Sequence, residues 1–92
     1  MLFVALSRPL VPMAELQPTL SAHLEFMFGL EARGVLFASG PFTDSLGAGM
    51  TIVRAASADD AREILTGDPW IAAGLRAFEL HAWEIKEGTV RS

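Results

Sequence analysis

Four short stretches of the chain combine apolar character with the length of a β-strand. Residues 2–7 and 35–40 each begin as a continuous apolar run, which indicates buried strands. Residues 50–55 are rich in β-branched side chains, and residues 77–86 alternate between two kinds of side chain. The pattern therefore predicts four strands in these ranges, separated by segments with a different periodicity.

The segment between the first two strands has the periodicity of a helix. Its apolar positions fall on one arc at about 100° per residue: Leu16, Leu20, Leu24, Met27 and Phe28. Pro18 suits the first turn of such a helix, and Gly34 suits the position just after its end. The sequence therefore predicts a long first helix that buries this arc.

The segment between the third and fourth strands predicts a second helix followed by a short helical turn. Ser57 is a good N-cap, and Asp60 follows it at the spacing of a capping box. The helix is expected over residues 58–65, with Gly67 ending it. In Asp68-Pro69-Trp70, the aspartate is expected to cap a further turn that has the proline at its first position.

The resulting order, βαββαβ, predicts an α+β ferredoxin-like fold, in which a four-stranded antiparallel sheet carries both helices on one face. We expect residues 1–92 to form one domain, with a frayed tail over residues 87–92. The helix-free face receives Trp83 and Ile85 from the last strand. Because an exposed apolar face favours association, we expect a homodimer in which a second copy packs sheet against sheet.

Composition narrows the classes of partner and location. Hydrophobic residues make up 51% of the chain, which excludes a disordered protein. The net charge is −4 and the basic residues form no stripe, so neither nucleic acid nor a membrane is an expected partner. The absence of cysteine excludes disulfides, thiolate metal sites and cysteine nucleophiles. No signal-like or membrane-spanning stretch is present, so we expect a cytoplasmic protein.

Several short motifs, in their order along the chain, resemble the YCII-related family of the dimeric α+β barrel group. They are His23-Leu24, Gly34-Val35-Leu36, Gly40-Pro41, Asp68-Pro69-Trp70 and Ala73-Gly74-Leu75. The resemblance covers nearly the whole chain and implies the same ferredoxin-like fold. It also implies acid–base chemistry by a histidine and an aspartate at a cleft, and one branch of the family is associated with dehydrochlorinase activity on aromatic substrates.

His23 and Asp44 are the candidate catalytic residues. His23 lies near the start of the first helix, where the helix dipole helps to keep an imidazole neutral and therefore basic. Asp44 lies in the polar loop after the second strand, and we expect it to meet His23 at the rim of the sheet. Both also have structural interpretations, as a half-buried histidine with one hydrogen bond and as an Asx turn.

Four further residues are expected to line the cleft and contact a substrate: Ser39, Gly40, Pro41 and Trp70. The Ser39 hydroxyl and the Gly40 amide can bind a substrate oxygen, and the family resemblance suggests that Trp70 walls the cleft. Ser39 can equally satisfy the end of a strand, and Trp70 can serve only as an aromatic anchor. No metal site is expected, because the two histidines lack the spacing of metal ligands.

Three functions stay open at this point. The first is a cofactor-independent lyase or isomerase that acts on a small cyclic or aromatic substrate; no cofactor is expected because no cofactor-binding motif is present. The second is a small-ligand-binding module without catalysis. The third is a structural homodimer without a ligand. A serine nucleophile is disfavoured, because no G-x-S-x-G elbow accompanies the serines.

Overall fold

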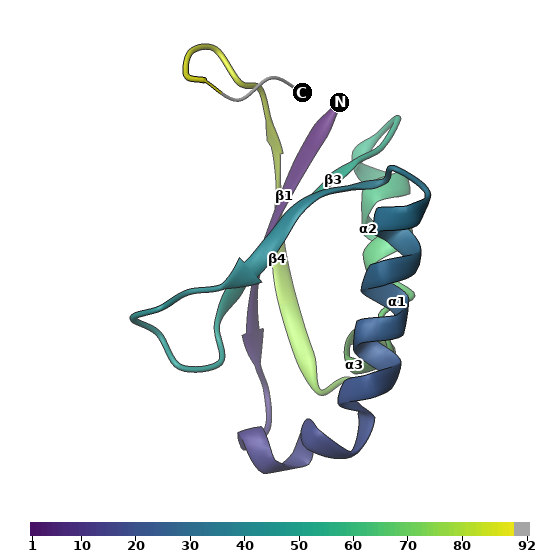
Figure 1. Ribbon diagram of the computed structural model, residues 1–92, viewed down its shortest axis with the longest axis vertical. Coiled ribbons are helices and arrows are strands. Elements are labelled where there is room, and N and C mark those ends of the chain that lie inside the picture. The colour runs from purple at the N-terminus through teal and green to yellow at the C-terminus, as the bar shows by residue number, and fades with distance from the viewer. Residues whose placement is uncertain (90–92) are drawn as a thin grey trace.

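The computed structural model describes residues 1–89, which form a four-stranded antiparallel sheet covered by helices on one face (Figure 1). The strands lie in the order β2-β3-β1-β4, with the bounds β1 (Leu2–Pro9), β2 (Leu36–Pro41), β3 (Gly49–Arg54) and β4 (Arg76–Trp83). The helices are η1 (Met13–Glu15), η2 (Gln17–Thr19), α1 (Leu20–Ala32), α2 (Ala58–Thr66) and α3 (Pro69–Ala72). This arrangement confirms the predicted α+β ferredoxin-like fold. No helix within residues 1–89 has both the length and the apolar character that crossing a bilayer requires.

The last strand, β4, ends at Trp83, earlier than the sequence pattern predicted. Trp83 pairs with Leu2, which is the first residue of β1, so the chain beyond Trp83 has no neighbouring strand. Ile85 therefore follows the strand and is not part of it. The tail predicted over residues 87–92 lies partly outside the described residues, which end at residue 89.

The core lies between the sheet and the helix layer and is built from alternate positions of the strands and from the buried side of α2. It consists of Phe3, Ala5, Val53, Ala61 and Leu65, with Phe78 and Leu80 of β4 packed against it. Ala5 pairs with Leu80, so both residues point to the same, helix-covered face. Since side chains alternate along a strand, Trp83 points to the opposite, helix-free face. The alternation predicted for the last strand is confirmed up to its end at Trp83.

Helix α1 is rotated about its axis relative to the orientation that its apolar positions predicted, so a different set of side chains is buried. Met27 and Leu30 are its buried residues, and His23 lies one turn before Met27 on the same stripe. Leu24 and Phe28, which the predicted arc placed in the core, are 41% and 62% exposed. Because this helix is apolar on most of its sides, periodicity alone does not determine which side packs on the sheet.

A side-chain cap begins helix α2, and a glycine at its end lies close to α1. The Ser57 side chain accepts a hydrogen bond from the Asp60 amide at 3.1 Å, as the predicted capping box requires. Helix α2 ends at Gly67, where an added Cβ would lie 3.0 Å from Cε1 of Phe26 in α1. This close approach allows the next residue, Asp68, to lie against α1.

The β2–β3 hairpin projects from the sheet, away from the helix layer (Figure 1). Pairing of the two strands continues to Pro41 and Gly49, and the Phe42 amide then donates to the Ala48 carbonyl at 2.9 Å. Gly47, with φ of +82°, adopts the left-handed conformation that the turn requires. The extended pairing carries the polar loop of the hairpin away from α1.

Candidate functional site

A histidine and an aspartate from distant parts of the chain meet beside the N-terminal half of α1. Nδ1 of His23 lies 2.8 Å from Oδ2 of Asp68, within the range of a charge-assisted hydrogen bond. The side chains of His23 and Asp68 are 19% and 11% exposed, respectively. The pair is therefore largely shielded from water, but the imidazole still reaches the surface.

Helix α3 holds Asp68, which caps its N-terminus. Oδ1 of Asp68 accepts a hydrogen bond from the Trp70 amide at 2.9 Å, while Oδ2 faces His23. The Asp68 amide donates to the Leu65 carbonyl at 3.1 Å, which ties the residue to the end of α2. Because each carboxylate oxygen has its own partner, the carboxylate cannot rotate without breaking a hydrogen bond.

Trp70 fixes the plane of the His23 imidazole. The two rings are stacked, with centroids 3.9 Å apart and an angle of 13° between their planes. Nε1 of Trp70 donates to the Leu16 carbonyl at 3.1 Å and to Oγ1 of Thr19 at 2.9 Å, which anchors the indole to the turns before α1. The imidazole is thus supported on one face by the indole and at its edge by Asp68.

The hydrogen bond to Asp68 determines which nitrogen of His23 can act as a base. A carboxylate oxygen only accepts hydrogen bonds, so Nδ1 carries the shared proton and Nε2 keeps a lone pair. Within the described part of the chain, the His23 ring makes no other hydrogen bond. Nε2 can therefore take a proton from a bound molecule, and Asp68 stabilises the imidazolium that results.

Arg76, the first residue of β4, adds a positive charge to this region. Its Cζ atom lies 5.9 Å from the centroid of the Trp70 ring, and its NH2 group donates to Oγ of Ser7 at 2.9 Å. Burial lowers the pKa of the Arg76 guanidinium, while the negative charge of Asp68 opposes this shift by raising it. Because a guanidinium stays protonated in proteins, a fixed positive charge faces the His23–Asp68 pair.

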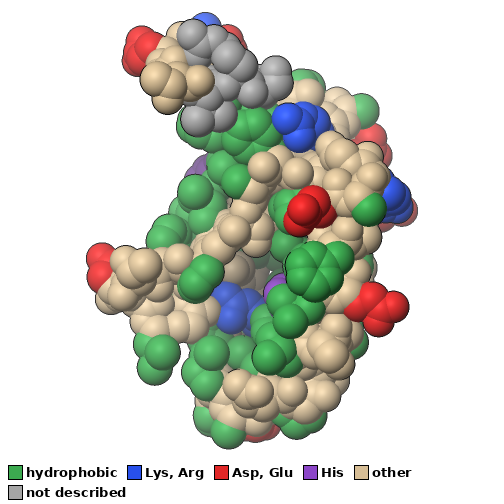
Figure 2. All heavy atoms as spheres, viewed as in Figure 1, with side chains coloured by type: hydrophobic (Ala, Val, Ile, Leu, Met, Phe, Trp, Pro, Cys, Tyr) green, Lys and Arg blue, Asp and Glu red, His purple; other side chains and the backbone are tan. Residues whose placement is uncertain are grey.

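The molecular surface is hollowed between the helix layer and the β2–β3 hairpin (Figure 2). Histidine and basic side-chain atoms are visible in the hollow, and hydrophobic side chains lie to the right of it and below it in this view. The position agrees with that of His23 and Arg76, whose contacts with Trp70 place them on the helix-covered side of the sheet. An apolar hollow with a few converging polar groups is typical of a site for a small molecule.

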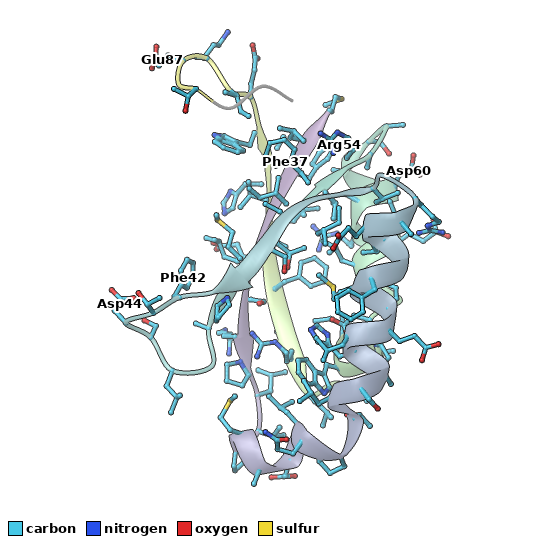
Figure 3. All side chains as sticks on the ribbon, viewed as in Figure 1. Phe37, Phe42, Asp44, Arg54, Asp60 and Glu87 are labelled. Carbon is cyan, nitrogen blue, oxygen red and sulfur yellow. The ribbon has the colours of Figure 1, made fainter. Side chains whose placement is uncertain are left out.

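Asp44 lies away from this site, at the outer end of the β2–β3 hairpin (Figure 3). It is exposed, and the structure does not bring it to His23, so the pairing expected from the sequence is replaced by the pairing of His23 with Asp68. The cause is the extended hairpin, which carries the loop away from α1. A signal for Asp68 was present in Asp68-Pro69-Trp70, but we interpreted this aspartate only as a helix cap.

The other predicted substrate-binding residues occupy two different places. Trp70 lies in the site, under the imidazole. Ser39, Gly40 and Pro41 lie on the exposed part of β2, where an added Cβ at Gly40 would meet no atom within 4 Å. Ser39 pairs with Thr51, and no hydrogen bond joins it to His23 or Asp68. A role for these three residues in binding a substrate therefore stays a prediction.

We expect Trp70→Phe to fold but to lose stability. The phenyl ring keeps an aromatic surface beside His23, but it has no N–H for the Leu16 carbonyl and the Thr19 hydroxyl. Leaving a buried acceptor unsatisfied should lower the free energy of unfolding by about 1–3 kcal/mol. Urea unfolding followed by far-UV circular dichroism measures this change. Thr19→Val, which removes one acceptor and keeps the indole, should cost less, and an unchanged midpoint for Trp70→Phe would contradict the anchoring role.

Comparisons with known proteins identify the family and agree with the fold. The model of the YCII-related domain matches residues 1–84. The chain is 34% identical over 71 residues to "Uncharacterized protein YjpA" of Bacillus subtilis (strain 168), a match that covers 77% of this chain and 82% of that protein. A solved structure of 5-chloro-2-hydroxyhydroquinone dehydrochlorinase (TftG) from Burkholderia phenoliruptrix AC1100, in complex with 2,5-dihydroxybenzoquinone, is similar with a TM-score of 0.76. That match has 23% sequence identity and covers 91% of this chain and 94% of that chain, and at this identity it establishes the fold.

Proposed function

The chain belongs to the YCII-related family, and from this premise we propose that it is an enzyme in which His23 exchanges a proton with a small cyclic or aromatic substrate. The observation that carries the proposal is the hydrogen bond of 2.8 Å between His23 and the shielded carboxylate of Asp68. A histidine that is oriented by a carboxylate through one nitrogen presents the other nitrogen as a general base.

The reaction begins when Nε2 of His23 takes a proton from a hydroxyl or carbon atom of the substrate. The electron pair of the broken bond moves into the substrate ring. The imidazolium returns the proton to another ring atom, which is an isomerisation; where that atom is the carbon that carries a leaving group, His23 then takes a second hydroxyl proton and the group departs with its bonding pair, so the two steps together are an elimination. Asp68 offsets the positive charge that His23 gains, which lowers the energy of the transition state.

The hollow favours a flat, partly apolar substrate. Trp70 supplies a buried aromatic surface next to the imidazole, and the exposed apolar side chains of Leu24 and Phe28 occupy a neighbouring stripe of α1. The structural relative named as a dehydrochlorinase was solved with a dihydroxybenzoquinone, which is a flat ring of this kind. Chlorinated hydroquinones are therefore the first substrates to test.

We also propose that the protein acts as a homodimer through the helix-free face of the sheet. Leu6 and Trp83 lie on this face and are 36% and 46% exposed. Glu79 and His81 lie between them on β4 and hydrogen-bond each other at 3.0 Å, so their polar groups are already paired. A second copy that packs sheet against sheet would remove this apolar surface from water.

Asp68→Asn tests the proposed function. Asparagine is as good an N-cap as aspartate, so its side-chain oxygen can keep the hydrogen bond from the Trp70 amide. Its NH2 group then faces Nδ1 of His23 and moves the imidazole proton to Nε2, which removes the base. We expect the release of chloride from 5-chloro-2-hydroxyhydroquinone to fall about tenfold or more, with little change in the melting temperature.

Asp44→Asn is the matched control, since it makes the same substitution at the exposed hairpin aspartate, and it should leave the rate unchanged. Equal rates in Asp68→Asn and the wild type would contradict the role of the pair. If the wild-type protein binds chlorinated hydroquinones, but neither releases chloride nor exchanges substrate protons with deuterated solvent, the hollow is a binding site without catalysis.

A further inference from the structure

Arg76 has hydrogen-bonding capacity that the protein does not use. Its guanidinium carries five N–H donors, and the hydrogen bond found for it goes from NH2 to Oγ of Ser7 at 2.9 Å. Among residues 1–89, no carboxylate forms a salt bridge with Arg76. A partly buried guanidinium that is held by a neutral hydroxyl keeps donors available for another acceptor.

The position of Arg76 connects it with the proposed base. Both Arg76 and His23 contact the indole of Trp70, the guanidinium at 5.9 Å and the imidazole at 3.9 Å from its centroid. Both groups therefore lie around the same indole, although the imidazole occupies one face of it. The nearest negative charge that acts on Arg76 belongs to Asp68, whose two oxygens already accept hydrogen bonds from His23 and the Trp70 amide.

The charges of the site are balanced only before proton transfer. Asp68 is the carboxylate and Arg76 the guanidinium, so the site with a neutral His23 carries one negative and one positive group. When His23 accepts a proton from the substrate, the site gains a positive charge and the substrate gains a negative one. A guanidinium with open donors stabilises a negative charge that develops next to it.

We propose that Arg76, positioned by Ser7, binds an anionic oxygen on the aromatic ring of the substrate, either a carboxylate or an ionised phenol. This inference rests on the proposed function, because it places the anion next to the ring from which His23 takes the proton. The planar guanidinium fork matches two oxygen atoms of a carboxylate and one strongly accepting phenolate oxygen. Arg76 thereby selects acidic aromatic compounds over neutral ones of the same shape.

Binding of benzoate and benzamide tests the selection, because these probes share a shape and differ in charge. Titrations followed by nuclear magnetic resonance should show that the wild-type protein binds benzoate at least about tenfold more tightly than benzamide. Arg76→Gln should remove this preference. Arg76→Lys should keep part of it, since lysine retains the charge but loses the fork. Arg62→Gln, which changes an exposed arginine of α2, is the control and should keep the full preference.

Ser7→Ala tests the same site without replacing Arg76, so the proposal can still be tested if the Arg76 variants misfold. It leaves the arginine and its charge in place but removes the hydroxyl that holds the guanidinium. We expect this variant to melt close to the wild-type temperature and to show a reduced preference for benzoate. Equal affinities of the wild-type protein for the two probes, or a preference that survives Arg76→Gln, would overturn the proposal. The same comparison with 4-nitrophenolate and 4-nitroanisole shows whether a phenolate is accepted as well as a carboxylate.

His23→Gln separates this proposal from the proposed function. The variant lacks the base but keeps Arg76 and Ser7, so it should still prefer benzoate while proton transfer is lost. A wild-type protein that prefers benzoate and catalyses no proton transfer would contradict the function and leave the anion subsite standing. Catalysis without any preference for the anionic probe would contradict the subsite alone.

Discussion

Replacing His23 by glutamine is expected to reduce turnover by about 100- to 10,000-fold, which is the contribution of a positioned general base. Glutamine can still donate a hydrogen bond to Asp68, so the shielded carboxylate keeps a partner. It has no nitrogen that takes up a proton near neutral pH. The stacking on Trp70 is lost, which should lower the free energy of unfolding by only about 1 kcal/mol. Steady-state kinetics and thermal melting of the same sample measure the two effects.

His81→Gln is the matched control for this experiment. His81 is the second histidine of the chain, and it also hydrogen-bonds a carboxylate, that of Glu79 at 3.0 Å. However, its side chain is 56% exposed and lies on the helix-free face, outside the hollow. Its replacement should leave turnover unchanged as long as the proposed homodimer is retained, which sedimentation of the same sample checks. A large loss of stability in His23→Gln without a loss of turnover would assign His23 a structural role.

Replacing Trp83 by glutamate is expected to dissociate the proposed homodimer. Trp83 is the most exposed large apolar side chain of the sheet strands within residues 1–89, with 46% exposure, and it lies on the helix-free face. In a sheet-against-sheet dimer, the new carboxylate would be removed from water without a partner. We expect the dissociation constant to rise at least about 100-fold, measured by sedimentation equilibrium.

Phe28→Glu provides the comparison for the dimer experiment. It introduces the same charge in place of another exposed aromatic residue, but on α1, and Phe28 is 62% exposed. This variant should associate as the wild-type protein does. A wild-type protein that sediments as a monomer at micromolar concentration, or a Phe28→Glu variant that dissociates as readily as Trp83→Glu, would refute the proposed interface.

Most of the fold could be predicted from the sequence because its signals are local. The capping box of Ser57 and Asp60 and the Pro69 start of α3 involve residues only a few positions apart. The alternation of β4 reflects the pleat of a single strand. The end of β4 at Trp83 was not predictable in this way, because it depends on where β1 begins on the neighbouring strand.

The candidate site was only half determined by the sequence. His23 stands out because it is the histidine of the first helix, and its residue type carries the chemistry. Its partner Asp68 lies 45 positions away, and the two meet where α3 packs on α1, next to Gly67, at which an added Cβ would lie 3.0 Å from Phe26. The rotation of α1 was equally hidden, since a helix that is apolar on most sides can pack in several orientations.

Asp44 and Arg76 show the same division between local and long-range information. The polar loop around Asp44 was visible in the sequence, but the length of the hairpin, which depends on pairing up to Pro41 and Gly49, decided that this loop points away from α1. Nothing in the sequence marked Arg76, the first residue of a strand, as a residue of the site. Only the packing of β4 beside β1, and of α3 on α1, brings its guanidinium to Ser7 and Trp70. Local patterns thus determine the elements of this protein, and the packing between elements decides which side chains share a site.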